Sequence, residues 1–458
     1  MTNPEAPAVG SRPAAALPPP SDGSLRLTAL ALALGLALAA FLLRNLIGAR
    51  GVGAIGVCCF ISFAAAFSAN LRAVNWRTIA WGMGLQLALA LFILKVQVGG
   101  VRPGFAFFSV VGRMVGRFLQ FTGAGSRFVF GGLADPAAMS KVFPGGFVFA
   151  FTALPTVIFI SSFFTVLYYF GILQFVVKTM ARVMMYLLQT SGAETLSAAA
   201  NVFMGQTEAP IIVKPYVPQM TQSELLALMV GGLATISGGV MAVYIALGAN
   251  PVAILTTSVM AAPCGLYLSK LLLPEMEEPV TRGEVKLVVE RQHVNVIDAA
   301  SAGASDGLVL AVNIAAMLIA FLAFIAFFDF MLALISPSLS LAKIFSWVFA
   351  PVAFLMGVPA ADIPAVADLL GTKLVANEFV AFVKLTGQYR NVIDERSYAL
   401  ATFALTGFAN FSSIGIQLGG IGGMAPTRRS DLARLGGRAL LAGFLATLIN
   451  ASLAAIML

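Results

Sequence analysis

Long apolar stretches recur along most of this chain and limit the folds that it can adopt. Hydrophobic residues make up 59% of the 458 positions and charged residues only 10%, whereas about a quarter of a typical soluble domain is charged. Apolar runs of roughly 20 residues are long enough to cross the hydrocarbon core of a bilayer as helices. The sequence therefore predicts an all-α polytopic membrane protein. The predicted full spans are 25–47, 52–71, 77–97, 146–171, 222–247, 251–273, 306–335, 398–422 and 434–457.

Other apolar regions do not fit a simple span. The stretch 103–132 is interrupted by arginines and glycines, which predicts an interfacial helix followed by a loop. The runs 172–190 and 341–359 are amphipathic and are also expected at the interface. The regions 192–218 and 362–388 have polar tips, and we predict that they are re-entrant helical hairpins, because irregular backbone at membrane depth must face protein or water.

The placement of lysine and arginine gives the orientation. With nine spans, two re-entrant hairpins and a cytoplasmic N-terminus, four loops rich in these residues face the cytoplasm, and the C-terminus lies outside. Arg44, Arg50 and the arginines of 103–132 do not fit this scheme.

Several function classes lack the residues that they need. The net charge of +8 comes from lysines and arginines in separate loops, which suits anionic membrane lipid and not a nucleic-acid polymer. Cys58, Cys59 and Cys264 have no metal-ligand spacing, and His293 is the only histidine. The chain has no phosphate-binding Walker motif and no nucleophile or zinc motif, so we expect neither an enzyme nor an ATP-driven pump.

Polar residues gather at two positions that should lie deep in the membrane. The stretch NVFMGQTEAP (201–210) carries two amides, a hydroxyl and a carboxylate at the first hairpin tip, and a span broken at TISGG (235–239) follows it. The second hairpin has Asn377 and Glu378 at its tip and precedes a span broken at GFANFSS (407–413). Opposite insertion of the two hairpins makes this an inverted repeat, the arrangement that places substrate and coupling-ion sites near the midplane of transporters.

Each of these residues also has a purely structural explanation. A lysine can neutralise a buried glutamate, and Asn410, Ser412 and Ser413 can join helices through hydrogen bonds. An intramembrane carboxylate more often faces a pathway, however, because its burial is unfavourable. The mirrored pairing of two glutamate-tipped hairpins with two broken helices favours a binding site.

These motifs resemble the concentrative nucleoside transporter family. The resemblance is carried by NVFMGQTEAPIIVKPYVPQMTQSEL, GGLATISGGV, VANEFVAF and GFANFSSIGIQLGG, and it runs from about residue 52 to the C-terminus. The sequences NWRTIAWGMGLQLALALFILK and GGFVFAFTALPTVIFISSFFTVLYYFG are similar to the family's scaffold helices. The helix at 25–47 lies outside this core.

The resemblance implies a homotrimer whose transport domains move as elevators and import nucleosides, such as uridine, with sodium. No other cofactor is expected. It implies that the first hairpin tip binds the base through Gln206, Thr207 and Glu208, and that Val240 and Phe408 pack on the base. The second half would hold the ribose through Glu378, Asn410 and Ser413. Sodium would bind near the first tip, with the Asn201 and Thr235 side chains and the Met204 and Ile236 carbonyls as oxygen ligands.

Some alternatives stay open. A proton can replace sodium, because a desolvated carboxylate can carry one, and base preference is undetermined. An intramembrane enzyme and a passive channel are more distant alternatives. The expected location is a bacterial inner membrane. The predicted organisation is a disordered tail (1–24), an additional helix (25–50), mainly scaffold helices with an interfacial segment (51–171), a first transport repeat (172–273), a cytoplasmic loop with a scaffold helix (274–335) and a second transport repeat with the C-terminal helix (336–458).

Overall fold

The computed structural model describes residues 23–139, 141–142, 148–282 and 293–458. The predicted disordered tail therefore lies outside the described residues, apart from its last two positions. The described part is helical, with one isolated β-bridge between Val98 and Val101. Seven of its helical stretches are long and apolar enough to cross a membrane. The all-α, multi-pass fold is confirmed.

Three buried helices form the centre of the molecule. α10 (Gln222–Ala234), α12 (Pro251–Leu272) and α20 (Arg429–Met457) pack on one another, and every residue of α10 is buried. Against them lie α1 (Gly23–Ala66), which bends at Gly48 (φ 63°) between the two spans predicted there, and α2 (Trp76–Leu94). The two halves of α1 are separate helices that fold back on each other at Gly48, because the Arg26 side chain donates to the Ala66 carbonyl (2.9 Å) and the Cys59 thiol donates to the Ala33 carbonyl (3.2 Å).

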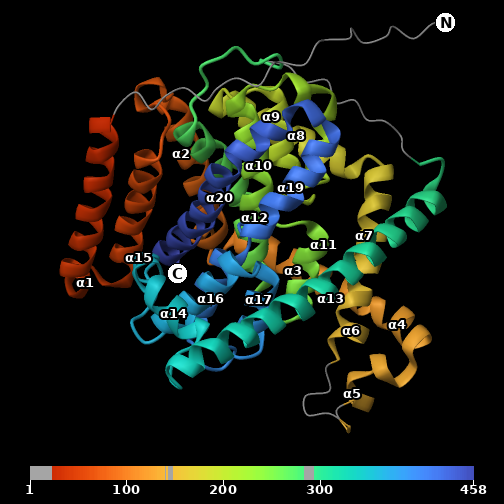
Figure 1. Cartoon of the computed structure of the whole chain (residues 1–458). Helices are drawn as coiled ribbons and strands as arrows, with labels where there is room; N and C mark the ends of the chain where they lie inside the picture. The colour runs from red at the N-terminus through yellow and green to blue at the C-terminus, as the bar shows by residue number, and fades with distance from the viewer. Residues whose placement is uncertain (1–22, 140, 143–147, 283–292) are drawn as a thin grey trace, which may run out of the picture.

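A second group of helices packs beside this bundle. α7 (Leu154–Tyr169) lies on the opposite side of the molecule from α1, and α13 (Val296–Ile335) packs along α7 and runs diagonally across the molecule (Figure 1). The structure thus divides the region 51–171: α1 and α2 join the central bundle, whereas α7 joins α13. α13 begins ten residues before the predicted span, because Asn295 caps it by accepting a hydrogen bond from the Asp298 N–H (2.9 Å). Its 40 residues measure about 60 Å, twice the hydrocarbon thickness, so it tilts or projects beyond the bilayer.

Short helices connect these groups. The predicted interfacial stretch 103–132 forms two helices where one helix and a loop were expected, because Phe121 has helical backbone angles and the helix resumes at once. The amphipathic runs 172–190 and 341–359 are helical. The short elements are α3 (Pro103–Gln120), α4 (Thr122–Phe130), α5 (Pro136–Met139), α6 (Phe149–Thr152), α8 (Ile172–Leu188), α14 (Leu341–Val348), α15 (Ala350–Leu355), η1 (Leu71–Ala73), η2 (Gly131–Ala134) and η4 (Pro426–Arg428).

Two helical hairpins and two broken helices fill the remaining space. In the first hairpin, α9 packs against a 3-10 segment, η3, whose three prolines remove backbone donors that an α-helix needs. The second hairpin has two α-helical limbs, and both spans predicted to be broken are interrupted. The bounds are α9 (Gly192–Ala200), η3 (Ala209–Gln219), α11 (Gly238–Ala246) after α10, α16 (Ile363–Val375), α17 (Glu378–Thr386), α18 (Glu395–Leu405) and α19 (Phe411–Met424).

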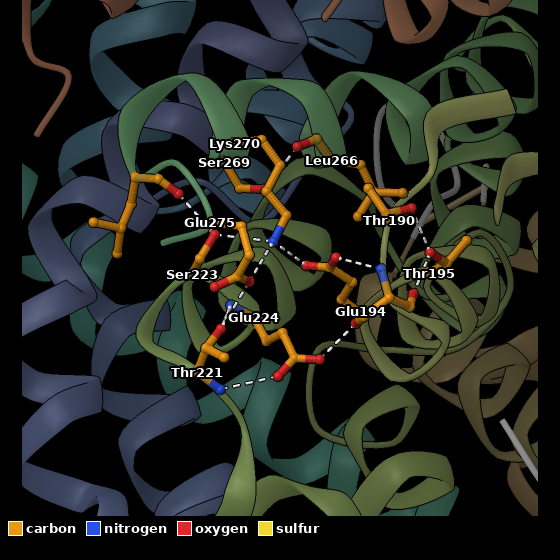
Figure 2. Close-up of polar contacts among 12 residues, drawn as sticks. Thr190, Glu194, Thr195, Thr221, Ser223, Glu224, Leu266, Ser269, Lys270 and Glu275 are labelled. Carbon is orange, nitrogen blue, oxygen red and sulfur yellow. Dashed lines mark hydrogen bonds and ion pairs between the residues drawn. The ribbon is translucent and has the colours of Figure 1, made fainter. Parts of the chain in front are cut away.

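A buried ionic cluster fastens the base of the first hairpin to the bundle (Figure 2). Lys270, near the end of α12, lies 2.7 Å from Glu194 of α9 and 3.2 Å from Glu275, and it donates to the Ser223 hydroxyl of α10 at 2.9 Å. Glu194 and Glu224 each accept from the backbone N–H of their own helix cap, and the two caps are joined by a 2.5 Å hydrogen bond from Ser191 to Glu224. Lys270 and these carboxylates therefore connect α9, α10 and α12 at the base of the hairpin.

We expect Lys270→Met to destabilise the protein strongly, because it leaves the buried Glu194 carboxylate without its cation. Removing one partner of a buried ion pair costs about 3–5 kcal/mol, and Lys270→Arg should retain most of that stability. The free energy of unfolding in mild detergent, measured with denaturant, tests this. Arg282→Met breaks an exposed pair with Glu278, in which the side chains are 76% and 79% exposed, and is the matched control. Equal stability of the Lys270→Met and Arg282→Met variants would show that the cluster does not anchor the hairpin.

Candidate functional site

The two hairpin tips and the two helix breaks meet around one cavity of about 160 Å³. All eight side chains predicted to contact substrate line it. Ser237 of the first break and Asn377 of the second hairpin tip add polar atoms, and Leu310, Ile314 and Met317 of α13 close one side. The predicted residues that line the cavity are Gln206, Thr207, Glu208, Val240, Glu378, Phe408, Asn410 and Ser413.

Three helices begin at the wall of this cavity. Ser237, Asn377 and Asn410 are the N-caps of α11, α17 and α19, and their side chains accept from the N–H of Val240 (3.3 Å), Val380 (2.8 Å) and Ser413 (2.9 Å). A helix N-terminus carries a partial positive charge. The converging ends therefore stabilise a carboxylate there and attract ligand oxygens.

Glu378 is the first residue of α17 and is buried at the cavity wall. One of its carboxylate oxygens accepts from the Tyr244 hydroxyl at 3.2 Å, and the other accepts from the Asn410 amide at 2.7 Å. Within the part of the chain that the structure describes, Lys373 makes no direct ion pair with Glu378 and donates its hydrogen bonds to the Ala404 carbonyl (2.7 Å) and the Thr447 hydroxyl (2.9 Å). Glu378 is thus held in place by neutral donors and keeps lone pairs for a ligand.

The first hairpin tip presents the second carboxylate. Gln206 donates to Ser413 at 3.3 Å, while its buried carbonyl oxygen has no hydrogen-bond partner among the described residues. Glu208 is exposed to the cavity. A side chain at position 205 would meet the Glu208 carboxylate, so the glycine there lets this carboxylate keep its place.

Hydrogen bonds connect the breaks and the tip. The Phe408 N–H donates to the Thr235 carbonyl at 3.1 Å, and the Gly238 N–H donates to the Phe203 carbonyl at 2.8 Å. Gly407 has φ of +158°, and a Cβ there would meet the Thr447 methyl at 2.6 Å. The unwound segments are therefore closely packed and satisfy each other's backbone groups.

The predicted sodium ligands lie behind the tip. Asn201 and Thr235 are buried beside Gly231: the Asn201 amide nitrogen lies 2.9 Å from the position of a Cβ there, and the Thr235 hydroxyl donates to the Gly231 carbonyl at 2.8 Å. The Asn201 amide oxygen has no hydrogen-bond partner among the described residues. Ile236 is fully buried, and Met204 lines a neighbouring cavity. A buried acceptor without a donor suits a cation that prefers oxygen ligands.

That neighbouring cavity, of about 250 Å³, shares Gly205, Glu208 and Ser237 with the first and extends along α7 and α13. It reaches Asp306 and His293, the only histidine of the sequence. His293 lies 3.6 Å from Asp298. Glu208 therefore lines both cavities.

Some residues of the site were missed by the sequence analysis. Tyr244 does not line the cavity but donates to Glu378, and the hydroxyl that it carries within an apolar segment was the only available signal. The α13 residues Leu310, Ile314 and Met317 carry no signal, because they do not differ from residues that face lipid.

Comparisons with known proteins agree with this arrangement. Three family descriptions match successive parts of the chain: "Na+ dependent nucleoside transporter N-terminus" over residues 55–133, "Nucleoside recognition" over 150–251 and "Na+ dependent nucleoside transporter C-terminus" over 253–455.

Similar proteins are found in mammals and bacteria. Sodium/nucleoside cotransporter 1 of Mus musculus is 44% identical over 423 residues, which cover 88% of this chain and 63% of the relative. The chain thus spans less than two thirds of the length of that relative. An uncharacterized transporter of Haemophilus influenzae is 42% identical over 414 residues, which cover 88% of this chain and 97% of that protein.

Solved structures share the fold. CNTnw in an inward-facing substrate-bound state has a TM-score of 0.84 and 38% identity, covering 90% of this chain and 98% of that one. An outward-facing CNTnw variant has the same TM-score at 36% identity, with the same coverage of both chains. The relatives are transporters and not enzymes, as the sequence predicted. This chain belongs to the Na+-dependent, concentrative nucleoside transporter family.

Proposed function

We propose that this protein imports nucleosides, such as uridine, by sodium symport. The observation that carries the proposal is the convergence of all eight predicted substrate side chains, from four separate elements, on one small cavity at the helix breaks. A small cavity lined by both hairpin tips suits a transporter better than a passive channel. The mammalian and CNTnw relatives support the nucleoside assignment.

The first hairpin tip would bind the base. A nucleobase has a planar face and an edge of hydrogen-bond donors and acceptors. The free Gln206 carbonyl and the Glu208 carboxylate can accept from that edge, and Thr207 can donate or accept. Val240 and Phe408 line the same cavity and would pack on the faces of the base.

The second half would bind the ribose. Glu378 is positioned by Tyr244 and Asn410 and can accept from vicinal hydroxyls through charge-assisted hydrogen bonds. Asn410 and Ser413 add further polar groups at the N-terminus of α19. A deoxy analogue would leave some of these groups unpaired and should bind poorly.

Sodium would bind behind the first tip. The Asn201 amide oxygen and the Thr235 hydroxyl would be ligands, joined by the Met204 and Ile236 carbonyls. The ion would then order the turn from 201 to 208 that presents Gln206, Thr207 and Glu208. Ion and nucleoside binding would thus favour each other, as coupling requires.

The remaining features of the proposal concern assembly and movement. α13 exposes a long apolar face, with only 6% of its most apolar window buried within one chain, which suits packing against other copies in a homotrimer. The α7–α13 pair would be the fixed part, and the hairpins with their broken helices would be the moving part of an elevator. We place the protein in a bacterial inner membrane with the N-terminus cytoplasmic and the C-terminus periplasmic.

An imposed sodium gradient should drive uptake of radiolabelled uridine into proteoliposomes. Uptake should saturate with uridine and fall to the background level when choline replaces sodium at equal ionic strength. A proton gradient alone should drive little uptake; efficient uptake with protons and none with sodium would favour proton coupling. Competition by unlabelled adenosine measures whether purines share the site. Absence of uptake for every nucleoside would contradict the proposed function.

Glu378→Gln should weaken nucleoside binding by roughly 10- to 100-fold, because a hydrogen bond to a charged group contributes about 1.5–3 kcal/mol. The variant should also discriminate less between uridine and deoxyuridine, which an effect on folding alone would not produce. Binding of both ligands to purified protein, measured calorimetrically, tests this. Glu395→Gln changes an exposed glutamate at the start of α18 and is the control. Unchanged discrimination would remove Glu378 from the ribose site.

Thr235→Ala should raise the sodium concentration for half-maximal uptake by about tenfold, because it removes one ion ligand. Thr235→Ser keeps the hydroxyl and should behave like the parent protein. Thr406→Ala is a matched control, because Thr406 ends α18 as Thr235 ends α10, and its hydroxyl likewise donates to the carbonyl four residues earlier (2.7 Å). An equal change in sodium dependence for both alanine variants would mean that Thr235 is not a specific ligand.

A further inference from the structure

The arginines of α3 and α4 have no role in the proposed transport cycle. Arg113, Arg117 and Arg127 lie on these two helices, and within the described ranges no carboxylate lies in ion-pair distance of any of them. In the proposed orientation they lie on the outer side, where the positive-inside bias disfavours them. Their position therefore calls for another anionic partner.

A large apolar cavity lies directly beside α3. Its volume is about 740 Å³, and it is lined by α3, α7, α8, the first hairpin turn, α11 and α12. Aromatic and aliphatic side chains such as Phe118, Ile160, Met241 and Val259 form its wall, and Arg117 is the only charged residue among the described residues that line it. An apolar cavity offers water few partners and does not retain it, whereas a bilayer supplies hydrocarbon chains at the same depth.

We propose that this cavity binds a phospholipid with an anionic headgroup. An acyl chain would fill the space between α3, α7 and α12, and the headgroup phosphate would lie against Arg117 at the rim and Arg113 one turn earlier on the same helix face. Guanidinium groups bind phosphate oxygens through paired hydrogen bonds. The arrangement thus matches both parts of one lipid, an apolar chain and a negative head.

The lipid would contact the back of the broken helix. Gly238, Met241 and Ala242 of α11 face this cavity, whereas Ser237 and Val240 of the same segment face the nucleoside cavity. Phe203, whose carbonyl accepts from the Gly238 N–H, also lines the apolar cavity. A lipid there would therefore restrict movement of α11 past α7, and anionic lipid should change the rate of any transport that uses this movement.

The experiment measures the lipid directly and does not depend on transport. The parent protein is purified from membranes that contain anionic phosphatidylglycerol and neutral phosphatidylcholine, and its bound lipids are identified by native mass spectrometry. It should retain phosphatidylglycerol in preference to phosphatidylcholine. Combining Arg113→Gln with Arg117→Gln should reduce retained anionic lipid by about tenfold or more and abolish the preference. Arg127→Gln on α4 removes a charge outside the cavity and should retain the parent behaviour.

A second variant tests the apolar part. Val259→Phe adds bulk to the half-buried α12 wall and leaves every arginine in place, so it should reduce retention of both lipids. Equal lipid retention in the parent, the double arginine variant and the Val259→Phe variant would overturn the proposal. So would dissociation of an oligomer by Val259→Phe without any change in lipid, which would show that a second copy of the chain fills the cavity.

Discussion

The hydrogen bond from the Phe408 N–H to the Thr235 carbonyl joins the two places where a helix is interrupted inside the membrane. Each interruption frees backbone groups that water cannot reach, and an unsatisfied group in hydrocarbon costs several kcal/mol. The two breaks are stable because each supplies a partner to the other. The same contact brings residues that are far apart in the sequence to one cavity, so the site exists only when both halves of the chain are folded together.

The two halves solve the same problem in related ways. Thr235 and Thr406 end α10 and α18, and each hydroxyl donates to the carbonyl four residues before it. Ser237 and Asn410 then cap the helices that resume after the breaks. The halves differ in their charges: Lys373 caps the Ala404 carbonyl within the second half, whereas Lys270 fastens the base of the first hairpin. A buried lysine thus helps to anchor each hairpin: Lys270 of α12 anchors the first, and Lys373 anchors the second. The tip carboxylates Glu208 and Glu378 line the cavity.

The polar residues at the tips and breaks could be found from the sequence, because an amide or carboxylate is conspicuous among apolar residues. Asn201, Glu208, Glu378 and Asn410 stand out for this reason, and the structure places the last three on one cavity wall. The contributions of α13 could not be found, since Leu310 and Ile314 look like any lipid-facing residue. α13 begins before its apolar stretch because Asn295 caps it. The residues around this cap are polar, so no hydrophobic pattern in the sequence indicated a helix start there. Helix boundaries and apolar contacts depend on tertiary packing, which the order of residues does not reveal directly.

In the proposed mechanism, the short turn between Asn201 and Glu208 would couple the sodium site to the nucleoside site within a small volume. Asn201 ends α9 with an amide oxygen that has no partner among the described residues, and Glu208 is exposed in the cavity seven residues later. Gly205 lies between them, where a Cβ would meet the Glu208 carboxylate, so the turn can place this carboxylate close to its own backbone. A cation bound at Asn201 and Thr235 would restrict this turn and also the break that carries Ser237. Any free energy that the ion would give to nucleoside binding would be returned equally by the nucleoside to ion binding, so the proposed coupling needs no longer pathway between the two sites.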